Sequence, residues 1–176
     1  APPAIIPLHE PPVIERNASG ASPFLLTCDH YGRQIPDALG DLGLPESERQ
    51  RHIAWDIGIA GVAERLSAAL GAHLIAQRYS RLVIDCNQPP QVASSIPALS
   101  EATVIPGNER LSPTEAGARR RAIFEPYHRR IADAIDERLA RSRPTILVSL
   151  HSFTPVYGGV ARPWHVGTLY HRSMVL

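Results

Sequence analysis

The chain has 176 residues, 44% of them hydrophobic, so it is long enough for one ordinary globular domain that buries roughly two thirds of its unfolded surface. Its formal net charge is +1 at pH 7, without a block of basic residues, which argues against a nucleic-acid-binding protein. No apolar run approaches the roughly 18 residues of a membrane span, so we expect no membrane partner and a cytoplasmic location.

The N-terminal part of the chain divides into an arm and the start of a domain. Residues 1–21 are rich in proline and end in NASGA, which predicts an extended arm, and residues 22–176 are predicted to form the domain. The run SPFLLTC, Ser22 to Cys28, is continuously apolar and predicts a strand buried on both faces.

A helix and further strands are predicted next. Between Ala54 and Leu70 the apolar residues recur with helical spacing, and Gly71 marks the predicted C-terminal end. The string HLIAQRYSRLVIDC, residues 73–86, predicts two strands, or one strand with a break near residues 78–81. Residues 87–111 contain several prolines and have no clear period, and loops of this length are often functional.

The second half begins with a helix signal. Ser112-Pro113-Thr114-Glu115 has the spacing of a capping box with proline at the first helical position. The helix has one apolar stripe, and its arginines, including Arg119–Arg121, are predicted to face water; Pro126 should kink or restart it. The stripe comprises Ile123, Tyr127, Ile131, Ala134, Ile135 and Leu139.

Two more strands complete the predicted fold. TILVSL (145–150) predicts a strongly buried strand, and HVGTLY (165–170) predicts another. Strands that alternate with long helices favour an α/β fold, a three-layer α/β/α sandwich with a largely parallel or mixed sheet. The cysteines Cys28 and Cys86 each end a β-type run, so buried thiols are expected rather than a disulfide.

Two histidines follow predicted strands directly. His30 comes after FLLTCD and His151 comes after ILVSL. In open α/β sheets, ligands bind beyond the carboxyl ends of the strands, so both side chains fall where a site is expected. One strand-end histidine is unremarkable, but two at the same edge suggest a shared ligand.

A hydrolytic zinc site takes three protein ligands of the histidine or carboxylate type and leaves one position for water. Two of them are supplied by His30 and His151. Asp56, in RHIAWDIG, is the best candidate for the third ligand, because it would lie in the first turn of the next helix. An aspartate there also interacts favourably with the helix dipole, which is an equally good explanation. His52 and Asp29 are rival ligands.

Six strings occur in order along the chain: CDHYGRQIP, HIAWDIG, YSRLVIDCNQPP, SEATVIPGN, PYHRRI and LHSFTP. In sequence and separation they resemble the N-formylglutamate amidohydrolase family, and the resemblance runs from about Phe24 to His171. It implies a zinc-carboxypeptidase-like fold, because that family is related to the zinc carboxypeptidases and aspartoacylases. HSFTP is similar to the segment that carries the last zinc histidine in that superfamily.

The resemblance also implies an activity and a site. The expected reaction is metal-dependent hydrolysis of an N-acyl amino acid, ideally N-formylglutamate to glutamate and formate, with zinc as the cofactor and a small anionic substrate as the partner. His30 matches the first metal histidine and His151 the last, while Asp56 remains our candidate for the third ligand. Arg81 and Asn87 match groups that hold the substrate carboxylate or polarise the amide oxygen.

The chain departs from the superfamily pattern at several points. The usual HxxE is here His30-Tyr31-Gly32-Arg33, and the usual Asn-Arg pair is Asn87-Gln88, which predicts weaker selection for a second substrate carboxylate. The glutamate that acts as general base is expected in a C-terminal segment beyond YHRSMVL, so no catalytic base is assigned. The alternatives are a hydrolase of another acyl amino acid or small peptide, and a non-catalytic metal-binding remnant of the fold.

Overall fold

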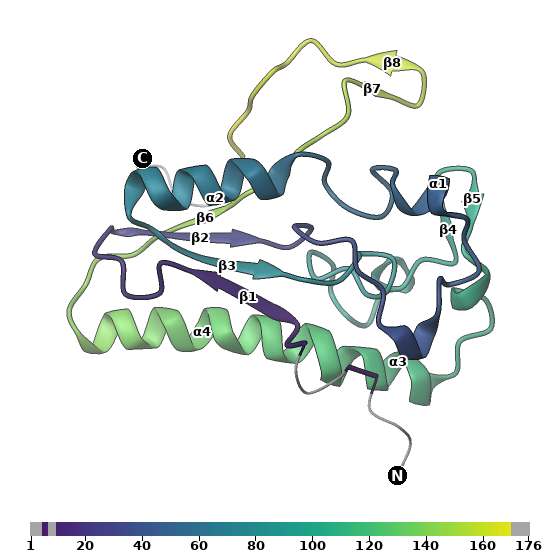
Figure 1. The fold of residues 1–176 in the computed structure, drawn as a ribbon, viewed down its shortest axis with the longest axis horizontal. Helices are drawn as coiled ribbons and strands as arrows, with labels where there is room; N and C mark the ends of the chain where they lie inside the picture. The colour runs from purple at the N-terminus through teal and green to yellow at the C-terminus, as the bar shows by residue number, and fades with distance from the viewer. Residues whose placement is uncertain (1–4, 7–9, 170–176) are drawn as a thin grey trace.

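A four-stranded sheet lies at the centre of the protein. The computed structural model describes residues 5–6 and 10–169. The sheet has the order β1-β3-β2-β6, formed by Val13–Arg16, His73–Gln77, Phe24–Cys28 and Ile146–Ser149 (Figure 1). Strands β3, β2 and β6 are parallel and β1 is antiparallel to β3, so the sheet is mixed.

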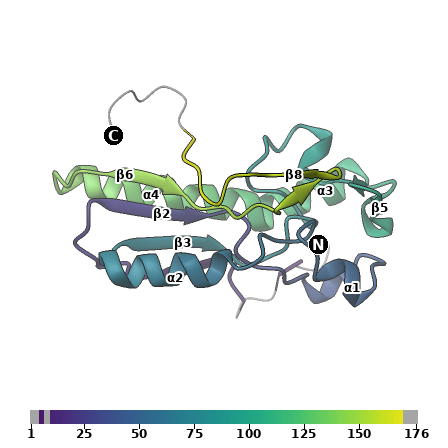
Figure 2. The same ribbon diagram turned by 90° about the horizontal axis from the view of Figure 1, so that it is seen from above.

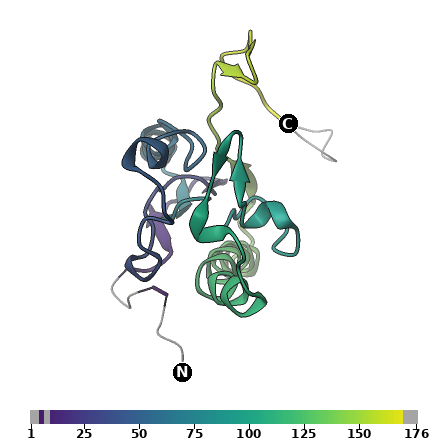
Figure 3. The same ribbon diagram turned by 90° about the vertical axis from the view of Figure 1, so that its right-hand side faces the viewer.

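Helices cover both faces of this sheet. Successive residues of a strand point to opposite faces, so Leu26 and Leu74 pack into one apolar cluster with α2 (Ile59–Leu70). Leu25 and Ile75 belong to a second cluster, which includes residues of α4 (Glu125–Ala140). Figures 1 and 3 show the sheet between these two helices. The predicted α/β fold with a mixed sheet is confirmed, whereas the closer likeness to a zinc-carboxypeptidase-like sandwich stays a prediction.

One long helical segment begins as its sequence predicts. Ser112 and Glu115 form both hydrogen bonds of a capping box at the start of α3 (Pro113–Arg119). A π-helical turn, Arg120–Phe124, follows, and α4 continues from it with Pro126 in its first turn, so the helix runs through the proline without a break. The prediction that Arg119 faces water is wrong: it is 2% exposed and donates hydrogen bonds to Asn108 and to two backbone carbonyls. Leu139, by contrast, is 73% exposed and lies outside the apolar stripe.

Shorter elements connect the main ones. A helix α1 (Glu46–Arg49) precedes α2, and two hairpins, β4 with β5 and β7 with β8, lie after β3 and β6. In Figures 1 and 2 the β7–β8 hairpin lies beyond the carboxyl end of β6. Strands β4 and β5 are Leu99–Ser100 and Thr103–Val104, and strands β7 and β8 are Val156–Tyr157 and Val160–Ala161. The 3-10 turns are Asp37–Leu39, Ala93–Ser95 and Pro106–Asn108.

Several predicted boundaries are wrong for local reasons. The helix predicted from Ala54 starts at Ile59, because Gly58 adopts a left-handed conformation at its N-terminus; its end at Gly71 (φ 57°) is confirmed. Only residues 73–77 of the string 73–86 form a strand, and turns follow. Within the predicted arm, residues 13–16 form β1, which pairs along β3.

The C-terminal predictions also need correction. Strand β6 exists, but Ile146 and Leu147 are 40% and 50% exposed, because β6 lies at the edge of the described sheet. Residues 165–169 form no strand, and Tyr170 lies outside the described residues. Cys28 and Cys86 are buried and free, as predicted. Among the described residues, no helix is long and apolar enough to cross a bilayer.

Candidate active site

The two candidate histidines meet at one edge of the sheet. Strands β2 and β6 are parallel neighbours in which Thr27 pairs with Ser149, so both strands end at the same edge. Their extensions bring the rings of His30 and His151 to a centroid separation of 5.0 Å at an interplanar angle of 63°. The prediction of a shared edge is therefore confirmed.

Asp56 lies between these rings. Its Oδ1 is 3.4 Å from His30 Nδ1, and its Oδ2 is 3.0 Å from His151 Nδ1. The backbone fixes this position, since Asp56 N donates to His30 O and Ser152 N donates to Asp56 Oδ2. The sequence predicted Asp56 in the first turn of a helix, and this is wrong. It lies in the turn that precedes α2. His30, Asp56 and His151 each offer one ligand atom, and the three atoms lie within 4.8 Å of one another.

The far side of the His30 ring contacts a second carboxylate. His30 Nε2 is 2.7 Å from Asp85 Oδ1. That oxygen also accepts a hydrogen bond from Asn87 N, and the other oxygen of Asp85 accepts one from Arg81 at 2.8 Å. Asp85 therefore fixes the orientation of His30 and positions Arg81 beside Asp56, where a guanidinium nitrogen is 3.6 Å from Asp56 Oδ1.

A similar arrangement supports His151 from its own far side. His151 Nε2 is 3.3 Å from Asp29 Oδ2 and 3.2 Å from Ser149 Oγ. The buried hydroxyl of Tyr127, on α4, donates to Asp29 Oδ1 at 2.7 Å. Each candidate histidine thus faces Asp56 with one ring nitrogen and a separate buried aspartate with the other, the arrangement that orients metal-bound histidines.

Electrostatics favour a cation between these groups. Three aspartates, Asp29, Asp56 and Asp85, gather here with one guanidinium, that of Arg81. Burial alone would lower the pKa of His30, but the neighbouring carboxylates of Asp56 and Asp85 raise it above its ordinary value. Hydrogen bonds with Asp29 and Asp56 raise the pKa of His151 to about 9.

The carboxylate between the rings is held in its charged form. Burial favours the neutral acid, but the neighbouring rings of His151 and His30 outweigh it and keep the pKa of Asp56 well below its ordinary value. His30 is 2% exposed, and within the described part of the chain its Nδ1 makes no hydrogen bond, although Asp56 Oδ1 lies 3.4 Å away. A buried nitrogen without a partner is costly in a folded protein. Two imidazole nitrogens and a carboxylate oxygen are donors that suit a divalent cation such as zinc.

Two cavities of similar size open near this edge. One, of about 400 Å³, is lined by Asp56, Arg81 and His52, and also by residues after His151. The other, of about 390 Å³, is lined by Asp29, Asn87 and Gln88. The two residues predicted to bind substrate, Arg81 and Asn87, therefore line different cavities.

The rival metal ligands take other partners. His52 Nε2 is 2.9 Å from Glu101 Oε1, in the turn of the β4–β5 hairpin, and His52 is not part of the three-residue group. Asp29 lies behind His151, away from Asp56. Both rivals are close to the site without belonging to that group.

Sequence reasoning missed three residues that support the histidines: Asp85, Tyr127 and Ser149. Asp85 stands four residues after Arg81, a spacing that brings the two side chains together in a helical turn, but the segment resembles a strand. Tyr127 was predicted only as part of an apolar stripe, and nothing in its spacing shows that its hydroxyl reaches Asp29.

Comparison with known proteins gives a consistent result. A family model described as N-formylglutamate amidohydrolase matches residues 22–175. An N-formylglutamate deformylase of Pseudomonas putida is 29% identical over 163 residues, covering 85% of this chain and 60% of the relative. One of Pseudomonas aeruginosa is 32% identical over 146 residues, covering 76% of this chain and 53% of the relative.

A solved structure is also similar. The crystal structure of a gene product from Agrobacterium tumefaciens has a TM-score of 0.88 and 42% sequence identity, and the match covers 90% of this chain and 63% of that one. The chain thus spans between about half and two thirds of the length of these relatives.

Proposed function

Because the chain belongs to the N-formylglutamate amidohydrolase family, we propose that it hydrolyses the amide bond of a small N-acyl amino acid, with N-formylglutamate as the substrate. Water adds to the formyl carbon, the C–N bond breaks, and the proton passes to the leaving nitrogen, giving formate and glutamate. One observation carries the proposal: the group of His30, Asp56 and His151 opens, through Asp56, onto a cavity that Arg81 also lines.

In this proposal His30 and His151 hold a zinc ion through their Nδ1 atoms, and Asp56 holds it through a carboxylate oxygen. The partnerless His30 Nδ1 and the surplus of carboxylates support this assignment. When bound, such an ion would lower the pKa of a water toward ~7 and polarise the amide carbonyl. Asp85 and Asp29 hold the far nitrogens of the two rings and keep their Nδ1 atoms turned toward Asp56.

Arg81 acts on the substrate rather than on the metal ligands. Its side chain is 31% exposed and lines the cavity, while its ion pair with Asp85 fixes its position. A guanidinium held in this way recruits a carboxylate or stabilises negative charge on the amide oxygen, and loss of such a donor typically costs about 10²–10³-fold in rate. Among the described residues, each aspartate at this edge is already bonded to a histidine or an arginine, so none is assigned as the general base.

The experiment measures formate and glutamate release from N-formylglutamate by the zinc-loaded protein, before and after treatment with a chelator. We expect release that is lost with the metal and restored by zinc. In His151→Gln, which changes a partly exposed side chain, release should fall by about 10²-fold or more.

The matched control is His165→Gln, which removes an exposed histidine after β8 and should leave the rate unchanged. Formate release that survives complete removal of metal, or that is equal in the two variants, would contradict the proposal.

A further inference from the structure

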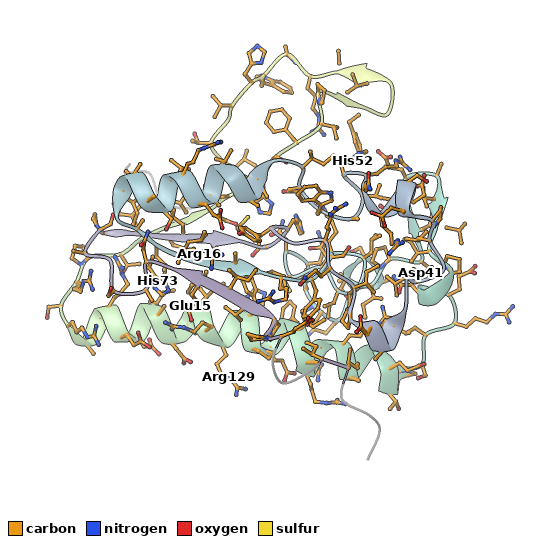
Figure 4. All side chains as sticks on the ribbon, in the orientation of Figure 1. Glu15, Arg16, Asp41, His52, His73 and Arg129 are labelled. Atoms are coloured by element: carbon orange, nitrogen blue, oxygen red, sulfur yellow. The ribbon has the colours of Figure 1, made fainter. Side chains whose placement is uncertain are left out.

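The cavity beside Asp56 contains a second arginine. Arg162 follows β8 directly, and its side chain lines the cavity together with Asp56 and Arg81. His52, which lines the same cavity, is labelled in Figure 4 and lies on the side of the body nearest the β7–β8 hairpin. The hairpin therefore brings a positive charge to the candidate active site from a segment that is far from Arg81 in the sequence.

The position of Arg162 is fixed by the hairpin itself. Its backbone N donates to Pro155 O at 2.8 Å, which closes the base of the hairpin. Its guanidinium carbon lies 5.0 Å from the ring centroid of Tyr157 and 5.6 Å from that of Phe153. Both rings also line the cavity. A guanidinium packed on aromatic rings is held in place while its N–H groups remain able to bind an anion.

Arg162 differs from Arg81 in its charge balance. Arg81 forms ion pairs with Asp85 and Asp56, so its charge is largely compensated by protein. Within residues 10–169, no carboxylate lies within ion-pair distance of Arg162. A positive charge packed on two aromatic rings, in a cavity that Asp56 also lines, is suited to an anionic part of a ligand.

The position from which the sequence analysis expected weaker selection for a second carboxylate, Gln88, lies elsewhere. Gln88 stands where the superfamily has the arginine of its Asn-Arg pair, but in this structure it lines the other cavity. Its side-chain oxygen accepts a hydrogen bond from Ser94. Gln88 is thus not among the residues around the cavity that contains Asp56 and Arg81.

We propose that Arg162 binds the side-chain carboxylate of the substrate and thereby selects acyl amino acids with an acidic side chain. This inference rests on the proposed function, and it replaces the weaker selection expected from Gln88. Arg81 then remains available for the α-carboxylate or the amide oxygen, so two guanidinium groups can serve a dianionic substrate from different walls of one cavity.

Binding of the two amino-acid products tests the inference without requiring turnover. L-glutamate and L-glutamine have side chains of nearly the same size and shape, one a carboxylate and the other a neutral amide, so the ratio of their affinities, measured by calorimetry on the zinc-loaded protein, reports on the second carboxylate. We expect the protein to prefer glutamate by about tenfold or more, since a charge-assisted hydrogen bond is involved. In Arg162→Gln this preference should fall to about twofold or less, while Arg162→Lys should retain part of it.

A charge reversal and a control sharpen the test. Arg162→Glu should favour L-lysine over L-glutamate, because the carboxylate would then attract a cationic side chain. Arg129→Gln is the matched control: Arg129 is an exposed arginine on α4, labelled in Figure 4, and its loss should leave the ratio unchanged. Thermal unfolding checks that each variant is folded.

The outcomes separate this inference from the proposed function. A protein without a preference for glutamate, or an Arg162→Gln variant that keeps the preference, overturns the role of Arg162. Metal-dependent formate release that persists in either case leaves the proposed function in place. Conversely, an Arg162-dependent preference without any formate release supports the anion site and contradicts the hydrolase.

Discussion

Two buried histidines lie at opposite ends of the sheet, and their surroundings differ. His73 is the first residue of β3 and is 4% exposed; its Nε2 is 2.6 Å from Glu15 Oε2, and the other oxygen of Glu15 accepts a hydrogen bond from Arg130. Figure 4 shows Glu15 beside His73, at the end of the sheet where β3 begins. His30, beyond the end of β2, is as deeply buried, but it contacts two carboxylates and keeps one nitrogen without a partner.

Burial of a histidine next to a carboxylate is therefore not in itself a sign of function. At His73 the carboxylate of Glu15 is compensated by an arginine, and the cluster joins β1, β3 and α4. At His30 the aspartates outnumber the guanidinium, and a nitrogen and an oxygen face each other at 3.4 Å. The surplus of negative charge and the partnerless nitrogen distinguish a candidate cation site from a structural contact.

The largest expected effect is on zinc affinity, which should depend on the residues at the His30 end of the sheet and not on those at the His73 end. Asp56→Ala removes the candidate carboxylate ligand and should weaken zinc binding by tens-fold, up to about 10²-fold. Competition with a chromophoric chelator measures the affinity. Asp29→Ala and His52→Ala should do less, and Glu15→Gln, at the opposite end of the sheet, should do nothing. An unchanged affinity in Asp56→Ala would transfer the ligand role to one of the rivals.

A smaller effect is expected behind the His30 ring. Asp85→Asn keeps the size of the side chain but removes the charge that holds His30 Nε2 and Arg81. Outer carboxylates of this kind typically contribute about 10-fold or more to metal affinity, so zinc should bind more weakly by roughly that factor. The rate with N-formylglutamate should fall further than the affinity, because Arg81 also loses its partner. Equal losses in rate and affinity would show that Asp85 serves the metal ligand alone.

A substitution at the His73 end of the sheet should change the stability of the protein and leave its zinc affinity unchanged. Glu15→Ala leaves the buried His73 and the partly buried Arg130 without their shared acceptor. A lost partner of this kind costs about 1–3 kcal/mol in the free energy of unfolding, which urea denaturation can measure. Zinc affinity should not change. A loss of metal binding in this variant would erase the distinction between the two histidines.

The smallest effect is the pH dependence of that contribution. Burial raises the pKa of Glu15, but hydrogen bonds with Arg130 and His73 outweigh it and lower the folded-state pKa below the ordinary value of 4.5. A carboxyl with a lowered folded-state pKa stabilises the protein above its unfolded-state pKa, and this contribution is lost as pH falls through the folded-state value.

The difference in unfolding free energy between the protein and Glu15→Gln should therefore be constant above about pH 5 and shrink at lower pH. Urea denaturation at a series of pH values measures it. A difference that grows on acidification would contradict this prediction.

The sequence predicts the centre of this fold better than its margins. The apolar run 22–28, the capping box at Ser112 and the stop at Gly71 each depend on local chemistry, and the structure has all three. The run 82–84 is as apolar as a buried strand, yet it lies among turns, because Leu82, Val83 and Ile84 fill the core without joining the sheet. The burial of these side chains explains why they are apolar. The apolar pattern does not reveal whether the backbone that buries them is a strand or a turn.

The candidate site likewise contains residues that the sequence predicts and residues that it does not. His30 and His151 could be predicted because parallel strands end at one edge, and that rule needs no side-chain detail. Asp56 is brought between them by a turn rather than by the helix start that was predicted. Tyr127 and Arg162 reach this region from α4 and from a hairpin, through tertiary contacts that no spacing in the sequence encodes.

The π-helical turn at Arg120–Phe124 also sets the rotational phase of the helix that follows it. A wider turn holds an additional residue, and each residue rotates the side chains about the helix axis by roughly 100°. With this phase, Tyr127 points into the core with its hydroxyl on Asp29, while Arg119, before the turn, faces the loop carbonyls. Removal of one residue from the turn would convert it to an ordinary helix and rotate Tyr127 away from Asp29. The length of one helical turn, on the far side of the sheet, therefore determines whether the aspartate behind His151 is held in place.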